Sequence, residues 1–299
     1  MVNYHRRLKM RQTLLAYTFL AIPLLIMIVF IYYPIGFGVN LSLYKYDIIS
    51  TKEFVGLKNF SSLMHDKYFW NAMKNSILYL AVVPVLQFLS ILLAVMVNAD
   101  IKARSFFRLM LFIPVVTPMT IVALTWRWIF RERGILDYML FSLKLIDDPV
   151  GYLSNPKIAL FMIMFVTMWK GLGYYMMIYL AGLQNISQDY LDAARIDGAK
   201  RWQVFFHVTL PLLKPYIFFC STMSAIAALN VFTEIYAMTR GGPNYATETM
   251  PMLVYRWAFR YLKFGYSSAA ATLFSIVVFA FTLLNFRLFR EGGVRSYYE

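Results

Sequence analysis

Residues 190–215 read YLDAARIDGAKRWQVFFHVTLPLLKP, and this polar stretch separates two long apolar segments of the chain. Just before it, Ser187 can cap the start of a helix, and Gly198 can end that helix. Ala193 and Ala194 leave one face of the predicted helix without bulk, so another helix or backbone could approach closely. The residues that follow continue as an amphipathic helix. By physical chemistry alone, an ordinary helix–turn–helix loop describes the stretch as well as a docking element does.

The composition around this stretch indicates that a membrane is the solvent. Of 299 residues, 60% are hydrophobic, 18% are aromatic and 15% are charged, whereas soluble domains carry about 25% charged residues. A net charge of +14 would suggest nucleic acid for a soluble protein, but here 29 lysines and arginines can anchor the chain at the membrane interface. We therefore expect lipid and no nucleic acid as a partner. The single cysteine, Cys220, excludes an intrachain disulfide.

Six apolar stretches are long enough to cross a bilayer, which takes about 20 residues of helix. The first is too long for the core of a signal peptide and no small-residue cleavage site follows it, so we interpret it as a retained span. The six predicted spans are Leu14–Ile35, Ile77–Val97, Leu109–Phe130, Ile158–Leu183, Leu212–Met238 and Ser267–Phe289.

The basic residues near the first span predict that both termini are cytoplasmic. Four of them precede this span, Arg6, Arg7, Lys9 and Arg11, while only Lys45 follows it within about fifteen residues. Six spans place both termini on the same side. The expected organisation is therefore a cytoplasmic tail at 1–13, a membrane domain at 14–289 with a polar cytoplasmic loop at about 184–211, and a cytoplasmic tail at 290–299.

The sequence contains no recognisable catalytic constellation. There is no G-x-x-x-x-G-K-[ST] phosphate-binding loop and no cysteine–histidine spacing typical of a metal site. The three histidines, His5, His65 and His207, are scattered along the chain. We therefore expect no enzyme activity, no cofactor and no metal on this chain.

The spacing within the polar stretch resembles the EAA loop of ABC importer permeases, which reads E-A-A-x-x-x-G, nine residues, I-x-L-P. Here Asp192-Ala193-Ala194 and Gly198 are followed, after nine residues, by Val208-x-Leu210-Pro211, and AARIDGA is similar to the sugar-permease version throughout. Three other stretches also resemble this family: FVGLKNF at 54–60, SFFRLMLFIPVVTPMTIVALTWRWIF at 105–130 and TRGGPNYATETMPMLVYRWAF at 239–259. The resemblance covers nearly the whole chain and is strongest to carbohydrate importers, in the branch with the MalF-like half of heterodimeric permeases.

The resemblance implies an all-α integral membrane protein with six transmembrane helices and a cytoplasmic coupling-helix loop between the fourth and fifth. Its function would be ATP-driven, binding-protein-dependent import of a sugar or oligosaccharide across a bacterial or archaeal cytoplasmic membrane. Implied partners are a second permease, two copies of a cytoplasmic ABC ATPase that carry the ATP and Mg, and an extracytoplasmic sugar-binding protein. The implied ATPase-coupling residues are Asp192, Ala193, Ala194, Asp197, Gly198, Ala199, Leu210 and Pro211.

The chain departs from the family pattern at two positions of this loop. Asp192 replaces the usual glutamate and is one methylene shorter, and Ser187 stands where proline is frequent. Either change could alter the fit to the ATPase. Neither changes the charge pattern or the predicted helix.

Polar groups inside the fourth and fifth spans are candidates for the substrate path, because such groups are costly in a membrane. In TMWKGLGYYM at 167–176, the resemblance points to Thr167, Lys170, Gly171 and Tyr174, and the aromatic face of Trp169 would suit a sugar ring. The same glycines and aromatic residues would also serve helix packing. In the fifth span, Asn230 and Glu234 are candidates, and Glu234 either pairs with Lys170 or accepts hydrogen bonds from sugar hydroxyls.

Two alternative functions remain open from the sequence. The same machinery could carry another cargo, such as glycerol phosphate or an amino acid. A self-sufficient channel or secondary carrier is a different class, which would not need a coupling loop and would usually show internal repeats or charged relays.

Overall fold

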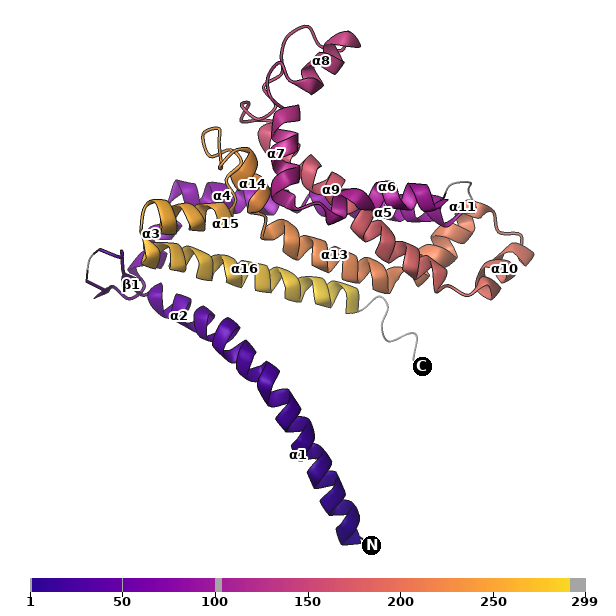
Figure 1. Cartoon of the computed structure of the whole chain (residues 1–299), viewed down its shortest axis with the longest axis horizontal. Helices are drawn as coiled ribbons and strands as arrows, with labels where there is room; N and C mark the ends of the chain where they lie inside the picture. The colour runs from indigo at the N-terminus through magenta and orange to yellow at the C-terminus, as the bar shows by residue number, and fades with distance from the viewer. Residues whose placement is uncertain (1, 50, 100–103, 291–299) are drawn as a thin grey trace. The chain divides into compact units, whose positions relative to one another are not determined.

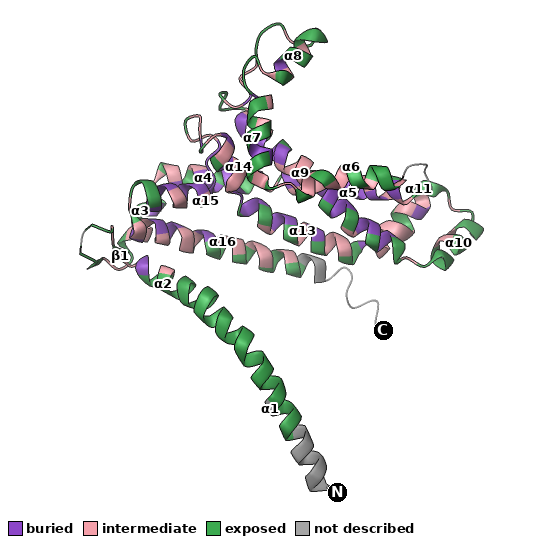
Figure 2. Cartoon of the chain, viewed as in Figure 1, coloured by how far each residue is buried: buried purple, intermediate pink, exposed green. Residues whose placement is uncertain are grey.

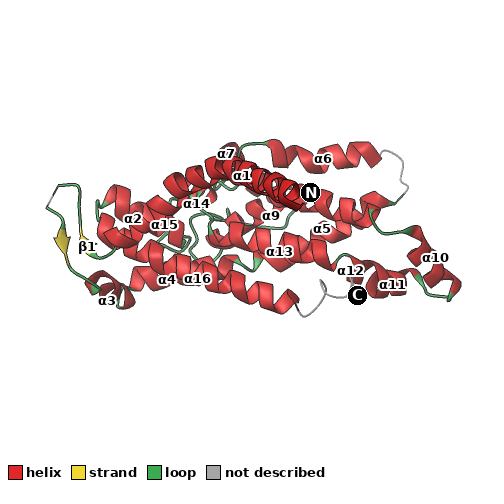
Figure 3. Cartoon of the chain, turned by 90° about the horizontal axis from the view of Figure 1, so that it is seen from below, coloured by secondary structure: helices red, strands yellow, loops and turns green. Residues whose placement is uncertain are grey.

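A computed structural model describes residues 2–49, 51–99 and 104–290, and helices make up most of them (Figure 1, Figure 3). The chain divides into two compact units. One unit combines Met1–His65 with Arg256–Thr272, and the other combines Asp66–Tyr255 with Leu273–Glu299. The predicted C-terminal tail lies, from residue 291 onward, outside the described residues.

The first unit contains a long helix, a short hairpin and the beginning of the last helix. Its elements are α1 (Val2–Met27), the π-helical turn η1 (Ile28–Tyr32), α2 (Tyr33–Leu41), β1 (Tyr44–Lys45), β2 (Glu53–Phe54), α3 (Lys58–Met64), the π-helical turn η3 (Arg256–Arg260) and the start of α16 (Phe264–Arg290). The strands pair antiparallel, with Tyr44 opposite Phe54. The Asn59 amide donates to the carbonyls of Ser42 and Tyr44 at 2.8 and 2.9 Å and holds the hairpin. Because α1 begins at Val2, the backbone of the predicted N-terminal tail is helical from that residue.

The second unit is a bundle of helices of unequal length. In chain order they are α4 (Lys67–Tyr79), α5 (Val82–Asn98), α6 (Arg104–Val116), α7 (Met119–Ile129), α8 (Ile135–Ser142), α9 (Ala159–Gln184), α10 (Gln188–Ile196), α11 (Arg201–Val204), the π-helical turn η2 (Phe205–Thr209), α12 (Leu210–Leu212), α13 (Lys214–Leu229), α14 (Thr233–Met238), α15 (Met250–Tyr255) and the remainder of α16 from Leu273. Helix α9 packs along α5 and α6, and its inward face is buried (Figure 2).

A buried polar network joins three helices of this bundle. The Gln87 side chain on α5 accepts the Tyr179 hydroxyl of α9 at 2.7 Å and donates to Ser224 Oγ of α13 at 2.8 Å. Gln87, Tyr179 and Ser224 are each less than 9% exposed. Side-chain hydrogen bonds of this kind fix helix contacts where the surrounding lipid offers no alternative partner.

The apolar helices agree only partly with the six predicted spans. Four stretches are continuous helices long enough to cross a membrane: Met10–Leu41, Lys67–Asn98, Ala159–Gln184 and Phe264–Arg287. Two further stretches are bent pairs, Arg104–Val116 with Met119–Ile129 at 98° and Arg201–Leu212 with Lys214–Leu229 at 66°. By length and composition, the described residues therefore supply four spans, or six if each bent pair crosses once.

The bent pairs differ from the sequence expectation for local reasons. Pro118 has no N–H and disfavours a helical conformation at Thr117, so the predicted third span breaks between α6 and α7. The sequence predicts a fifth span that runs to Met238 as one helix. Instead α13 ends at Leu229, and α14 begins only at Thr233.

Candidate functional site

A cavity of about 300 Å³ lies inside the second unit, walled by α5, the α6–α7 break, α9, α13 and the start of α14. We call it the Lys170 cavity. It brings together five of the residues that the sequence predicted for a substrate path: Thr167, Lys170, Gly171, Tyr174 and Glu234. The first four recur at positions i, i+3, i+4 and i+7 and therefore share one face of α9.

The ammonium group of Lys170 is held by the break in the neighbouring helix. Its Nζ donates to the Val115 carbonyl at 3.0 Å. In an unbroken helix this carbonyl would accept the N–H of Met119, but α6 ends at Val116 and α7 begins after Pro118. Lys170 thus satisfies a backbone group that the proline exposes, and irregular backbone of this kind is tolerated at membrane depth where it lines a cavity.

Glu234 enters the same cavity from the first turn of α14. Its carboxylate accepts the Thr167 hydroxyl at 3.4 Å, and Thr167 lies 2.6 Å from the hydroxyl of Tyr79, which is fully buried. No ion pair within 4.0 Å joins Glu234 to Lys170, both of which the structure describes. The direct pairing of Glu234 with Lys170, one of two possibilities from the sequence, is therefore absent from this structure.

Two of the predicted path residues lie away from the cavity wall. Trp169 packs against Trp126 in the core, with ring centroids 5.4 Å apart. Asn230 is exposed and donates its amide to the Ile226 carbonyl at 2.9 Å, at the end of α13. Sequence reasoning missed Ser224, which does line the cavity. Its only signal was a hydroxyl within an apolar segment.

The 239–249 loop supports the wall that carries Glu234. Thr249 is fully buried, and its hydroxyl donates to the Val231 carbonyl at 3.0 Å, in the gap between α13 and α14. The Asn75 amide of α4 donates to the carbonyls of Tyr245, Ala246 and Glu248 at 3.3, 3.1 and 2.9 Å. A chain of hydrogen bonds therefore runs from α4 through the loop to the gap before α14.

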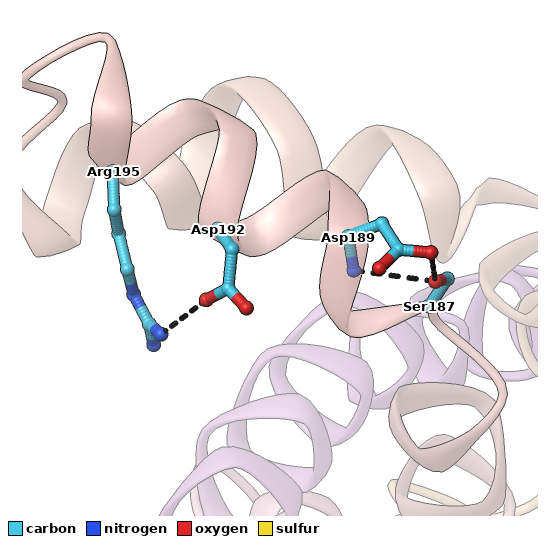
Figure 4. Close-up of polar contacts among 4 residues, drawn as sticks. All are labelled: Ser187, Asp189, Asp192 and Arg195. Atoms are coloured by element: carbon cyan, nitrogen blue, oxygen red, sulfur yellow. Dashed lines mark hydrogen bonds and ion pairs between the residues drawn. The ribbon is translucent and has the colours of Figure 1, made fainter.

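The predicted coupling stretch contains the expected short helix, α10, with the expected ends. Ser187 accepts the N–H of Asp189 at 3.2 Å and caps the helix start (Figure 4). At the other end, Gly198 has φ +79°, its N–H reaches the Arg195 carbonyl, and the N–H of Ala199 reaches the Ala194 carbonyl, each at 3.0 Å. This is a Schellman ending, which requires a left-handed residue where Gly198 stands.

Most side chains of α10 are exposed to solvent. None is buried, and Asp192 pairs with Arg195 one turn away at 2.9 Å while both remain more than half exposed (Figure 4). Among the other predicted coupling residues, Ala193 and Asp197 are exposed, Ala194 and Ala199 are half-buried, and Leu210 packs against the core beside the half-buried Pro211. A Cβ at Gly198 would meet nothing within 4 Å in this chain, so only the left-handed conformation at this position favours glycine.

The comparisons with known proteins agree with this architecture. Residues 87–291 match the family described as "Binding-protein-dependent transport system inner membrane component". The "Probable ABC transporter permease protein YurN" of Bacillus subtilis (strain 168) is 36% identical over 93% of this chain and 97% of its own length. The "Lactose transport system permease protein LacF" of Rhizobium radiobacter is 33% identical over 91% of this chain and 93% of its own.

A solved structure shares the fold. One chain of the bacterial alginate ABC transporter, solved in complex with an alginate pentasaccharide-bound periplasmic protein, superposes with a TM-score of 0.80. The match covers 96% of this chain and 98% of that one, at 23% sequence identity. At this identity the likeness concerns the fold alone.

Proposed function

Because the chain belongs to the family of binding-protein-dependent transport system inner membrane components, we propose that it is the permease subunit of an ATP-driven importer for a sugar or oligosaccharide. The family match, the relative named for lactose transport and the long apolar helices support a multi-pass protein of the inner membrane. Relatives named as permeases support a transport subunit rather than an enzyme.

The Lys170 cavity forms part of the sugar path, and the observation that carries this proposal is its lining. Lys170 and Glu234 both face the cavity, and no ion pair within 4.0 Å joins them. An ammonium group offers only donors and a carboxylate only acceptors, while Thr167 can act as either. A sugar ring with several hydroxyl groups needs this mixture, and the exposed Tyr174 adds an aromatic face.

The α10 helix couples the permease to a cytoplasmic ATPase. Its exposed side chains and its Schellman ending support this role, because a short helix with fixed ends and free faces can seat in a cleft of another protein. The residues that take part are Asp192, Ala193, Ala194, Asp197, Gly198 and Ala199, with Leu210 and Pro211 tying the segment to the core.

This role fixes the expected topology and assembly. The chain crosses the membrane six times, each bent helix pair counting as one crossing, and both termini and the loop at about 184–211 lie in the cytoplasm. It works with a second permease subunit, two copies of an ABC ATPase that bind ATP and Mg, and an extracytoplasmic sugar-binding protein. Alternating access then follows from movement of the two permease halves around a central path.

The test is to purify the assembled complex, count its subunits, and measure uptake and binding-protein-stimulated ATP hydrolysis in vesicles. Tyr174→Ala should leave assembly and stimulated hydrolysis intact while uptake is lost. Reduced yield with proportionally reduced uptake would assign Tyr174 to packing instead. Uptake by this chain purified alone, without an ATPase, would overturn the proposed function.

A further inference from the structure

A second cavity in the same unit, of about 1160 Å³, lies beyond the end of α7. We call it the arginine cavity. Its walls are the last turn of α7 with the residues that follow, the segment 149–154, and the segment 238–243. It is several times larger than the Lys170 cavity and therefore has room for several side chains of another molecule rather than one sugar ring.

The arginine cavity and α10 lie at opposite ends of α9. The wall segment 149–154 precedes α9 in the chain, and α10 follows it (Figure 1). The 26 residues of α9 span about 39 Å. That length exceeds the hydrocarbon thickness of a bilayer, which is about 30 Å. If α10 is cytoplasmic, as the proposed function requires, the arginine cavity opens to the outside.

Three arginines line the cavity without a carboxylate partner. In the described ranges, no carboxylate forms an ion pair within 4.0 Å with the guanidinium group of Arg127, Arg131 or Arg133. Arg127 Nη1 lies 3.4 Å from the Ala237 carbonyl, and the Arg131 guanidinium lies 5.7 Å from the centre of the Trp128 ring. All three side chains are exposed, so most of their donors face the cavity or solvent.

The nearby carboxylates are engaged elsewhere or lie outside the lining. Glu132, the one acidic residue of the lining, accepts the Ser154 hydroxyl at 2.5 Å. Asp137 is 1% exposed, and its oxygens accept the backbone N–H groups of Arg133 and Val150 at 2.7 and 3.2 Å. Asp147 and Asp148 are exposed just before the wall residue Pro149, but they do not line the cavity.

The buried Asp137 also fixes the backbone at Arg133, one of these three arginines. Because its carboxylate accepts the N–H groups of both Arg133 and Val150, it holds the two ends of this segment together. Arg133 adopts φ +58° at one of these ends. The Phe130 and Tyr152 rings, 5.8 Å apart and both less than 9% exposed, form the floor between α7 and the opposite wall. The positive groups therefore project from a preformed framework.

We propose that the arginine cavity is the docking site for an acidic protrusion of the extracytoplasmic substrate-binding protein, whose carboxylates bind Arg127, Arg131 and Arg133. The inference rests on the proposed function for the outward direction of the cavity and for the existence of this partner. Guanidinium groups bind carboxylates with two parallel hydrogen bonds, which gives orientation as well as affinity. Charged groups at the rim of an interface also raise the rate of association.

The carboxylate chemistry is tested with a labelled hexa-aspartate peptide on the full complex in nanodiscs of zwitterionic lipid. Arg131→Glu with Arg133→Glu should weaken peptide binding at least about tenfold. Lys144→Glu with Lys157→Glu is the matched control, since it changes the net charge equally at exposed positions outside the cavity. Equal weakening by both pairs would overturn the site, because binding would then follow the overall charge.

Two further anions, tested against peptide binding, distinguish a protein partner from an acidic cargo or a lipid headgroup. Glucuronate, a single carboxylate on a sugar ring, should leave peptide binding unchanged at millimolar concentration, and anionic lipid in the nanodisc should also leave it unchanged. Displacement by glucuronate would assign the cavity to an acidic cargo. Displacement by anionic lipid would assign it to a headgroup. Either result overturns the docking proposal.

The decisive arm uses the binding protein that stimulates the wild-type complex. The concentration of binding protein that gives half-maximal ATP hydrolysis should rise at least about tenfold in the arginine pair variant. The same concentration should stay unchanged in the lysine pair variant. Asp147→Asn with Asp148→Asn should lower it. A wild-type complex that no binding protein stimulates would overturn the proposed function itself. A stimulated wild-type complex with an unaffected arginine variant would overturn only the docking site.

Discussion

The 239–249 loop and the α10 segment both connect helices of the same unit, yet they are built in opposite ways. The loop buries Thr247, Glu248 and Thr249, and Asn75 of α4 donates to three of its carbonyls. Helix α10 buries no side chain, and its side-chain hydrogen bonds, among the described residues, reach at most three residues along the chain.

We interpret this difference as one between a region that is complete within the chain and a region that, under the proposed function, the ATPase completes. Long-range hydrogen bonds tie the 239–249 loop to the bundle, so its conformation depends on the fold. The ends of α10 are fixed by its own caps, at Ser187 and Gly198, and its neighbours are the nearby α11 and η2. Substitutions in the loop should therefore change stability or the cavity, whereas substitutions in α10 should change assembly with the ATPase while the permease stays folded.

The largest effect is expected for Gly198→Val. A β-branched residue cannot readily adopt φ +79°, so the Schellman ending should be lost and uptake should fall to background. The membrane helices should still insert, because no contact within 4 Å depends on this position. The measurements are membrane insertion, ATPase co-purification and uptake. Gly198→Asn is the control, since asparagine tolerates the left-handed conformation. Uptake by the valine variant at the wild-type level would contradict the docking role.

A smaller but global effect is expected for Asn75→Leu. This change removes the donor for the Tyr245, Ala246 and Glu248 carbonyls in a buried site, which should cost about 3 kcal/mol of stability. The thermal stability and yield of the purified complex report the loss. Asn71→Ala serves as the control one turn earlier, because Asn71 donates only to the Tyr245 carbonyl. If both variants melt alike, the loop does not depend on Asn75.

Thr249→Val should have a local effect on the Lys170 cavity. The Val231 carbonyl would lose its donor in the gap before α14, at a cost of about 1 kcal/mol, and Glu234 would be less well positioned. The expected result is a raised KM for cargo uptake with a nearly unchanged maximal rate and yield. Thr249→Ser keeps the hydroxyl and should restore the wild-type KM. An unchanged KM in the valine variant would disconnect the loop from the cavity.

The smallest effect is expected for Asp192→Glu. The Asp192–Arg195 pair is exposed on both sides, and such pairs contribute about 0.2–1 kcal/mol. Glutamate retains the charge, so ATPase co-purification and uptake should stay within about twofold of wild type. Asp192→Lys is the contrasting variant and should weaken co-purification. A strong defect with glutamate would show that side-chain length at this position matters to the ATPase contact.

The sequence predicted those parts of the site that depend on local rules. The ends of α10 followed from a capping serine and a glycine, and the shared face of Thr167, Lys170, Gly171 and Tyr174 follows from helical spacing. The same spacing, applied strictly, would have placed Trp169 on another face. Membrane helices were likewise recognisable from apolar length.

The rest depends on contacts between distant segments and was not predictable in this way. Pro118 can be recognised in the sequence as a helix breaker. The hydrogen bond from Lys170 to the freed Val115 carbonyl cannot be predicted in the same way, because it joins residues 55 positions apart. The entry of Glu234 into the cavity requires the gap between α13 and α14, which Thr249 supports from 18 residues away. The sequence pattern of the fifth predicted span did not predict this gap between α13 and α14.

The buried network around Gln87 limits which parts of the chain can move during transport. Its hydrogen bonds join α5 to both α9 and α13, the helices that wall the Lys170 cavity. Separating these helices would leave buried amide and hydroxyl groups without partners, at about 1–3 kcal/mol for each group. We therefore expect α5, α9 and α13 to move together as a single rigid body. Opening and closing of the path would then come from sliding at the boundary with another subunit, and not from a gate inside this bundle.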